Sequence, residues 1–94
     1  MNIGALKKYL NDHGAQEGFH YVVDALGDGE VHGIAQENGA WYTYYSERGA
    51  RRDKHVWGSE AEACEKFREL VMDYMQDTGD WKRADGEEED IWRV

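Results

Sequence analysis

A run of five residues, Trp41 to Tyr45, constrains the fold of this chain more than any other stretch. All five are aromatic or β-branched, which is the composition of a β-strand. Asn38 and Gly39 come just before the run and are typical of a tight β-hairpin, because both tolerate left-handed backbone angles. We therefore predict that residues 40–47 form the central strand of a sheet.

The segments on either side of this strand predict the rest of the sheet. Residues 19–26 alternate with a period of two and indicate a first strand, and 27–30 has the composition of a hairpin turn. Residues 31–36 indicate a weaker second strand. Residues 48–54 form a basic loop in this interpretation, and 55–58 follow as a short edge strand. Consecutive strands joined by short turns would make an antiparallel meander.

Two helices flank the predicted sheet in the sequence. Residues 2–12 indicate a short helix with Asn2 as its N-cap. Ser59 and Glu62 form a capping box, which predicts the start of a longer helix that runs to about Gln76. Apolar residues recur at spacings of three and four along this helix and define its buried face: Ala63, Cys64, Phe67, Leu70, Val71, Tyr74 and Met75.

These elements together predict an α+β fold. An N-terminal helix, an antiparallel meander of three to four strands and a long C-terminal helix follow in order, with both helices on one sheet face. The 94 residues allow one domain, over residues 1–79, followed by an acidic tail over 80–94. The tail contains Trp81 and Trp92, which either tuck back onto the domain or contact a partner.

The charge of the chain restricts the partners that it can bind. Acidic residues outnumber basic ones 20 to 11, which gives a net charge of −9. Such a chain repels nucleic acid and anionic membranes and attracts basic proteins. The alternative is that the acidity only maintains solubility. The single cysteine, Cys64, and the absence of an apolar leader segment predict a cytoplasmic location.

Residue patterns typical of catalysis are absent from the sequence. The four histidines show none of the spacings of a metal site, and Cys64 lies on the predicted apolar face of the last helix. No phosphate-binding loop follows a strand. We therefore expect no enzymatic activity, no cofactor and no bound metal.

Candidate partner-binding residues come from the central strand and the tail. Side chains alternate along a strand, so Trp41, Thr43 and Tyr45 share one face and Tyr42 and Tyr44 the other. If the helices cover the first face, the second displays two tyrosines that suit protein contact, unless the tail folds over them. Glu47 is a further candidate, and its alternative role is a structural one in the turn. Four acidic residues of the tail complete the predicted surface: Glu87, Glu88, Glu89 and Asp90.

The motif WYTYYSERG, followed by a basic segment and then by SEAEACEKF, resembles a family pattern over residues 39–67. The chain looks similar there to small bacterial immunity proteins of polymorphic toxin systems, including those of contact-dependent inhibition. That resemblance implies a non-enzymatic protein that binds a cognate toxin domain and blocks it in the producing cell. The family pattern does not identify the contacting residues.

The sequence thus favours a cytoplasmic immunity protein that neutralises a toxin with a basic active-site surface, for which a nuclease is a suitable candidate. The alternative is an acidic interaction module, or a nucleic-acid mimic, with an unrelated partner. A small enzyme is a third class and would require a concave pocket with convergent polar groups. The residue pattern does not determine the oligomeric state.

Overall fold

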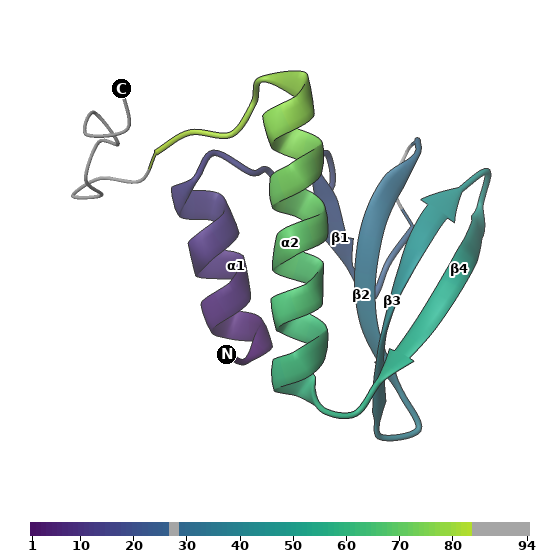
Figure 1. Ribbon diagram of the computed structural model, residues 1–94. Coiled ribbons are helices and arrows are strands. Elements are labelled where there is room, and N and C mark those ends of the chain that lie inside the picture. The colour runs from purple at the N-terminus through teal and green to yellow at the C-terminus, as the bar shows by residue number, and fades with distance from the viewer. Residues whose placement is uncertain (27–28, 84–94) are drawn as a thin grey trace.

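The computed structural model describes residues 1–26 and 29–83. Two helices lie on one face of a four-stranded sheet, and the strands follow the order β1-β2-β3-β4 (Figure 1). This arrangement confirms the predicted α+β fold. The elements are α1 (Ile3–Asp12), β1 (Tyr21–Val23), β2 (Val31–Glu37), β3 (Ala40–Glu47), β4 (Ala50–Trp57) and α2 (Glu60–Thr78).

Both helices begin at the capping residues that the sequence indicates. The Asn2 side chain accepts a backbone hydrogen bond from the first turn of α1, and Ser59 accepts one from the Glu62 N–H. The Glu62 carboxylate accepts from the backbone N–H of Gly58, at 2.8 Å, rather than from that of Ser59. Helix α2 ends at Gly79, whose φ of 82° permits the left-handed cap.

The β3–β4 connection differs from the prediction of a basic loop over 48–54. Arg48 and Gly49 both have positive φ, at 51° and 75°, and form a two-residue hairpin turn of the kind that suits twisted strands. The basic residues after this turn therefore belong to an eight-residue strand, β4. The predicted short edge strand over 55–58 corresponds to the C-terminal end of β4.

The first strand also runs in the opposite direction to the predicted one. Strand β1 pairs in parallel with β2, so the sheet is mixed, and only β2, β3 and β4 form an antiparallel meander. Asp24 adopts a φ of 53° and turns the chain out of β1. The backbone of Ala25 then hydrogen-bonds the Tyr44 hydroxyl. A period-two pattern specifies which side chains share a face but not the strand direction.

The main hydrophobic core lies between the helices and the sheet. Trp41 packs against it from the helix-facing side of β3, as the alternation predicts. Leu70 and Tyr74, however, remain 38% and 39% exposed on α2, so the buried face of that helix is narrower than its apolar stripe. The core consists of Leu6, Leu10, Ala15, Tyr21, Ile34, Ala63, Cys64, Phe67, Val71 and Met75.

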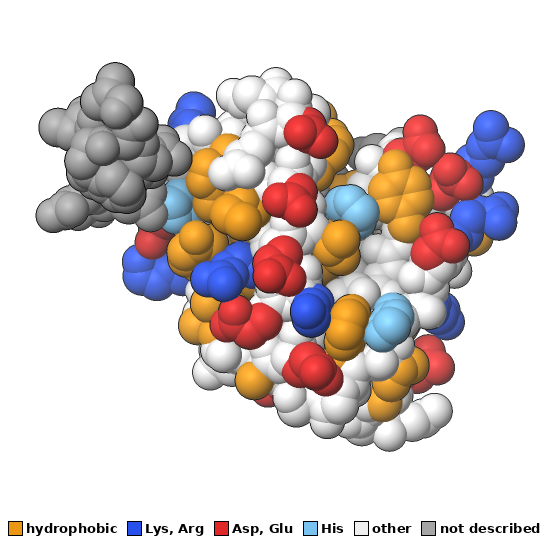
Figure 2. All heavy atoms as spheres, viewed as in Figure 1, with side chains coloured by type: hydrophobic (Ala, Val, Ile, Leu, Met, Phe, Trp, Pro, Cys, Tyr) orange, Lys and Arg blue, Asp and Glu red, His pale blue; other side chains and the backbone are white. Residues whose placement is uncertain are grey.

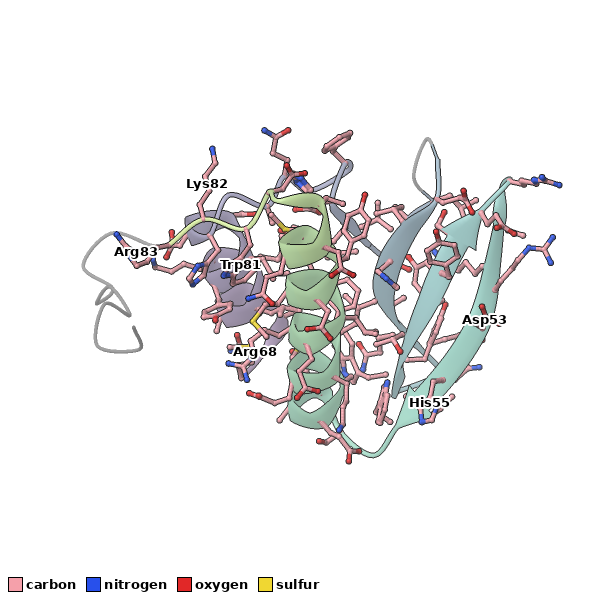
Figure 3. All side chains as sticks on the ribbon, turned by 45° about the horizontal axis from the view of Figure 1, so that its top comes forward. Asp53, His55, Arg68, Trp81, Lys82 and Arg83 are labelled. Atoms are coloured by element: carbon pink, nitrogen blue, oxygen red, sulfur yellow. The ribbon has the colours of Figure 1, made fainter. Side chains whose placement is uncertain are left out.

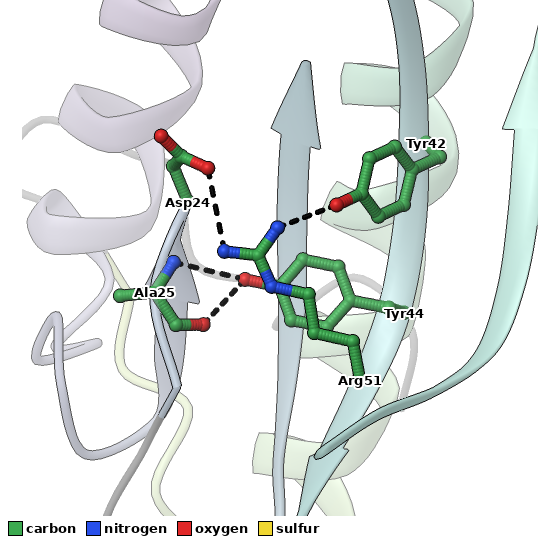
Figure 4. Close-up of polar contacts among 5 residues, drawn as sticks. All are labelled: Asp24, Ala25, Tyr42, Tyr44 and Arg51. Atoms are coloured by element: carbon green, nitrogen blue, oxygen red, sulfur yellow. Dashed lines mark hydrogen bonds and ion pairs between the residues drawn. The ribbon is translucent and has the colours of Figure 1, made fainter. Parts of the chain in front are cut away.

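The opposite sheet face carries a second cluster, which overturns the expectation that Tyr42 and Tyr44 are exposed. Each is only 3% exposed. The guanidinium carbon of Arg51, on β4, lies 4.8 Å from the centre of the Tyr44 ring, and the guanidinium donates a hydrogen bond to the Tyr42 hydroxyl (Figure 4). The Lys54 ammonium group lies over the Tyr42 ring. The long basic side chains of β4 therefore cover the tyrosines. Val22, Val31 and Ala35 complete this cluster.

The described start of the tail folds back onto the end of α1. The Trp81 ring stacks on His13 with 4.3 Å between ring centroids, and the Nδ1 atom of His13 lies 2.6 Å from the Lys82 carbonyl oxygen. His20 accepts a backbone N–H at Nδ1, so its Nε2 carries a proton and donates to Asp80. Trp81 therefore packs back onto the domain, which is the first of the two alternatives predicted for the tail tryptophans.

Gly33 leaves the space on β2 that the Tyr44 ring occupies. A Cβ atom at position 33 would overlap the Tyr44 ring carbons and hydroxyl oxygen. That ring is held by its bonds to Ala25 and by the Arg51 side chain, so it cannot move aside freely. The glycine that weakens the strand pattern in the sequence is therefore a packing requirement.

We predict that Gly33→Ala lowers the free energy of unfolding by about 1 to 3 kcal/mol, because the added methyl group overpacks the second cluster. Urea unfolding followed by circular dichroism measures this change. Gly29→Ala is the matched control, since a Cβ there meets no heavy atom within 4 Å. Equal stability of the two variants would contradict the assigned role of Gly33.

Candidate functional site

A groove lies between α2 and the helix-facing side of β3 and β4. Its volume is about 470 Å³, and one side opens to solvent. Figure 1 shows that α2 and β4 meet near their connection and diverge toward the β3–β4 turn. We call this hollow the α2–β4 groove and define it by its lining residues: His32, Thr43, Tyr44, Tyr45, Asp53, His55, Trp57 and Leu70.

Aromatic rings form the floor of the groove. The Trp57 indole N–H donates to the Thr43 hydroxyl at 3.1 Å, and the His55 ring lies 4.0 Å from the Trp57 ring. His32 makes an edge-on contact with Tyr45, with ring centroids 5.2 Å apart. These contacts hold the rings in place and leave them partly open to solvent, an arrangement that suits binding of an apolar group without reorganisation.

The wall of the groove is the face of α2 that carries Leu70 and Tyr74. These residues are one helical turn apart, and the Tyr74 ring contacts His32 edge-on at 6.3 Å. A second hollow of about 460 Å³ adjoins the groove, shares Trp57 and Leu70 with it, and is also lined by Glu69 and Asp73. Figure 2 shows hydrophobic and histidine side chains lying beside a row of acidic side chains on this face.

The wider end of the groove carries a pair of acidic side chains. A hydrogen bond with Glu30 raises the pKa of Glu47, and the nearby Arg52, at 3.3 Å from the Glu47 carboxylate, opposes this shift. Loss of hydration, together with the charges of Glu30 and Glu47, raises the pKa of Tyr45. Tyr45 is therefore a neutral hydrogen-bond donor at physiological pH.

The predicted partner-binding residues do not come together in the structure. Tyr42 and Tyr44 are buried in the second cluster, on the sheet face opposite the groove. Glu47 lies at the end of β3 and pairs with Arg52. The four tail residues lie outside the described part of the chain: Glu87, Glu88, Glu89 and Asp90.

The sequence-based prediction placed His55 and Trp57 in a short edge strand, so it did not identify the groove. One signal in the sequence points toward it. The apolar stripe of α2 is wider than one buried face requires, so Leu70 and Tyr74 extend beyond the core. Only the structure shows that Trp57 pairs with Trp41 across β3 and β4, which places an aromatic side chain on the helix-facing side of the sheet edge.

The chemical character of the groove is set by its lining residues and by the charges beside it. Among residues 1–26 and 29–83, no group of three or more His, Cys, Asp or Glu side chains could hold a metal ion. Burial raises the pKa of the Cys64 thiol to about 11, and that thiol lies in the main core. What the groove offers is apolar surface with adjacent negative charge.

Comparison with models of known protein families, with curated protein sequences and with solved structures yields no significant match to this chain. Neither described helix has the length and apolar character needed to cross a membrane.

We predict that part of the pH dependence of stability comes from His32. Burial lowers the pKa of this imidazole below the ordinary value of 6.5, so the unfolded chain takes up the proton at a higher pH than the folded chain. The neutral ring therefore stabilises the fold fully above about pH 6.5, and this contribution is lost as the pH falls toward the lower folded pKa.

Thermal unfolding of the wild type and of His32→Gln, between about pH 7.5 and pH 5.5, measures this contribution. The wild type should lose more stability over that range than the variant. Parallel pH curves for the two proteins would refute the assignment.

Proposed function

We propose that this protein is a non-enzymatic bacterial immunity protein that binds and neutralises a cognate toxin domain in the cytoplasm. We further propose that the toxin docks on the α2–β4 groove. One observation carries the choice of surface: the groove combines partly exposed aromatic side chains with an adjacent acidic stripe on α2.

The apolar part of the groove supports a protein-binding role. Leu70 and Tyr74 are exposed large hydrophobic residues on a single helix, and both border the aromatic floor. A few well-packed side chains, with tryptophan and tyrosine prominent among them, supply most of the affinity in protein interfaces. Contiguous exposed apolar surface with a polar border is typical of such interfaces.

The charge around the groove supports a basic partner. Glu69 and Asp73 line the hollow that adjoins the groove, and the whole chain carries a net charge of −9. A toxin that acts on a polyanionic substrate has a positive surface, and complementary charge accelerates association with it. The similarity of residues 39–67 to immunity proteins of polymorphic toxin systems supports the same partner class.

Co-expression tests this proposal. The chain is produced with the toxic C-terminal domain encoded immediately upstream of its gene, and survival and co-purification are scored together. We predict survival with a one-to-one complex. Leu70→Glu should weaken the complex at least about tenfold, because it places an unpaired charge against the aromatic floor.

Val56→Glu is the matched control, because Val56 is an exposed apolar residue on the other face of the same sheet edge. This variant should protect cells as the wild type does. Full protection by Leu70→Glu would exclude the groove as the docking surface. Continued killing by the toxin domain in the presence of the wild-type protein would exclude the immunity function.

We also predict that the association rate with the toxin domain falls several-fold between about 10 mM and about 150 mM salt. The Debye length shortens over this range from about 30 Å to about 8 Å, which screens long-range attraction to the acidic surface. Stopped-flow measurement of tryptophan fluorescence can follow this association. An unchanged rate would remove electrostatic steering from the mechanism.

A further inference from the structure

The helix layer of this fold covers the sheet incompletely. Helix α2 packs on β2, β3 and the end of β4, whereas α1 packs against α2 on the side away from β4 (Figure 1). In Figure 3, His55 and Asp53 lie on β4 at one side of α2, while Trp81 and Arg68 lie at its other side. The side of α2 that borders the groove therefore has no helical neighbour among the described residues.

We propose that the α2–β4 groove accepts a basic amphipathic helix of the partner, which completes the helix layer beside α2. This inference rests on the proposed function for the identity of the partner as a toxin. The preference for a helix, and for positive charge, follows from the groove itself.

The spacing of the wall residues fits a helix laid along α2. Leu70 and Tyr74 are four residues apart, so they form a ridge along the axis of α2. Neighbouring helices pack by setting such ridges into grooves at interaxial distances of about 8–10 Å. Apolar side chains of the incoming helix would enter the hollow above Trp57, whose volume of about 470 Å³ has room for more than one leucine.

The charges along the same side of α2 select a basic helix. Glu69 and Asp73 flank Leu70, and Asp77 lies one turn beyond Asp73. Lys66 is the cation on this stripe; it lies over the Trp57 ring and 4.0 Å from the Glu69 carboxylate. This side of α2 therefore carries three carboxylates and one ammonium group, an excess of negative charge. A helix docked along it would need lysine or arginine beside its apolar stripe to match that charge.

An extended strand is a poorer occupant than a helix. A strand would have to add to the edge of β4, but Asp53 adopts a φ of 55° at a β-bulge, which interrupts the hydrogen-bonding edge. Three further charged side chains line the same edge: Arg51, Arg52 and Lys54. Bulges and edge charges are features that discourage strand addition.

A second copy of this chain is also a poorer occupant. Symmetric pairing through the groove would bring the acidic side of α2 in one copy against the same acidic side in the other. The carboxylates concerned are those of Glu69, Asp73 and Asp77. The net charge of −9 on each chain adds long-range repulsion.

The probe for the first experiment is a synthetic amphipathic peptide of about 18 residues, long enough to hold a helix once docked. It carries leucine at helical spacing and lysine beside the leucines. One comparison peptide has glutamate in place of every lysine, and another has proline in place of its central residue. Binding is followed through the NMR signal of the Trp57 indole N–H, assigned with Trp57→Phe, and through the helicity of the peptide.

The lysine peptide should shift the Trp57 signal and gain helicity, whereas the glutamate and proline peptides should bind at least about tenfold more weakly. Leu70→Glu should abolish the shift, and Val56→Glu should retain it. Exchange of both Glu69 and Asp73 for lysine should reverse the preference and select the glutamate peptide.

Equal binding of the proline peptide would indicate an extended occupant and overturn the inference. Equal binding of the glutamate peptide would overturn the charge argument. A Trp57 signal that depends on the concentration of the protein alone would identify a second copy as the occupant. Absence of any peptide effect at Trp57 would also overturn the inference.

These outcomes are distinguishable from failure of the proposed function. If cells survive the toxin but the lysine peptide does not reach Trp57, the immunity function stands and the helix inference falls. If the lysine peptide docks as expected but the toxin still kills, the groove retains its preference for a basic helix and the toxin is excluded as its partner.

Discussion

Strand β3 carries aromatic side chains on both of its faces, and both hydrophobic clusters are built on it. Trp41 packs into the main core beneath the helices, whereas Tyr42 and Tyr44 form the second cluster on the opposite face. Neither described helix lies over the second cluster (Figure 1). The side chains of Arg51 and Lys54 cover it instead. Their aliphatic parts shield the tyrosine rings from solvent, and their cationic groups lie over the ring faces.

The coverage of Tyr42 and Tyr44 by β4 determines which sheet face can hold the candidate site. An antiparallel sheet with helices on one side usually leaves its other face to solvent, and that face would be the natural binding surface. Here the tyrosines of the outer face are covered by side chains of β4, and the helix side is the one left incomplete. Helix α2 diverges from β4 (Figure 1), and partly exposed residues line the groove between them.

Much of the fold could be predicted from local rules, and the candidate site could not. The caps at Asn2 and Ser59 and the hairpin at Asn38 are decided by side-chain and backbone chemistry within a few residues. The turn at Arg48 was missed because arginine rarely adopts a left-handed φ, and the strand that follows it was therefore interpreted as a loop. The groove depends on Trp57 and Leu70, which come from different elements and meet only when α2 crosses the sheet.

The sequence by itself determined the order and type of the elements, the helix boundaries, the alternation of side chains along β3 and the acidic character of the chain. These properties depend on interactions between near neighbours, or simply on composition. The tertiary structure decided the direction of β1, the burial of Tyr42 and Tyr44, and the partial exposure of Leu70 and Tyr74. Each of these depends on where a distant segment lies: a crossing loop, the side chains of β4 or the tilt of a helix. A local sequence pattern does not specify where distant segments pack, and the exposure of a side chain depends on that packing.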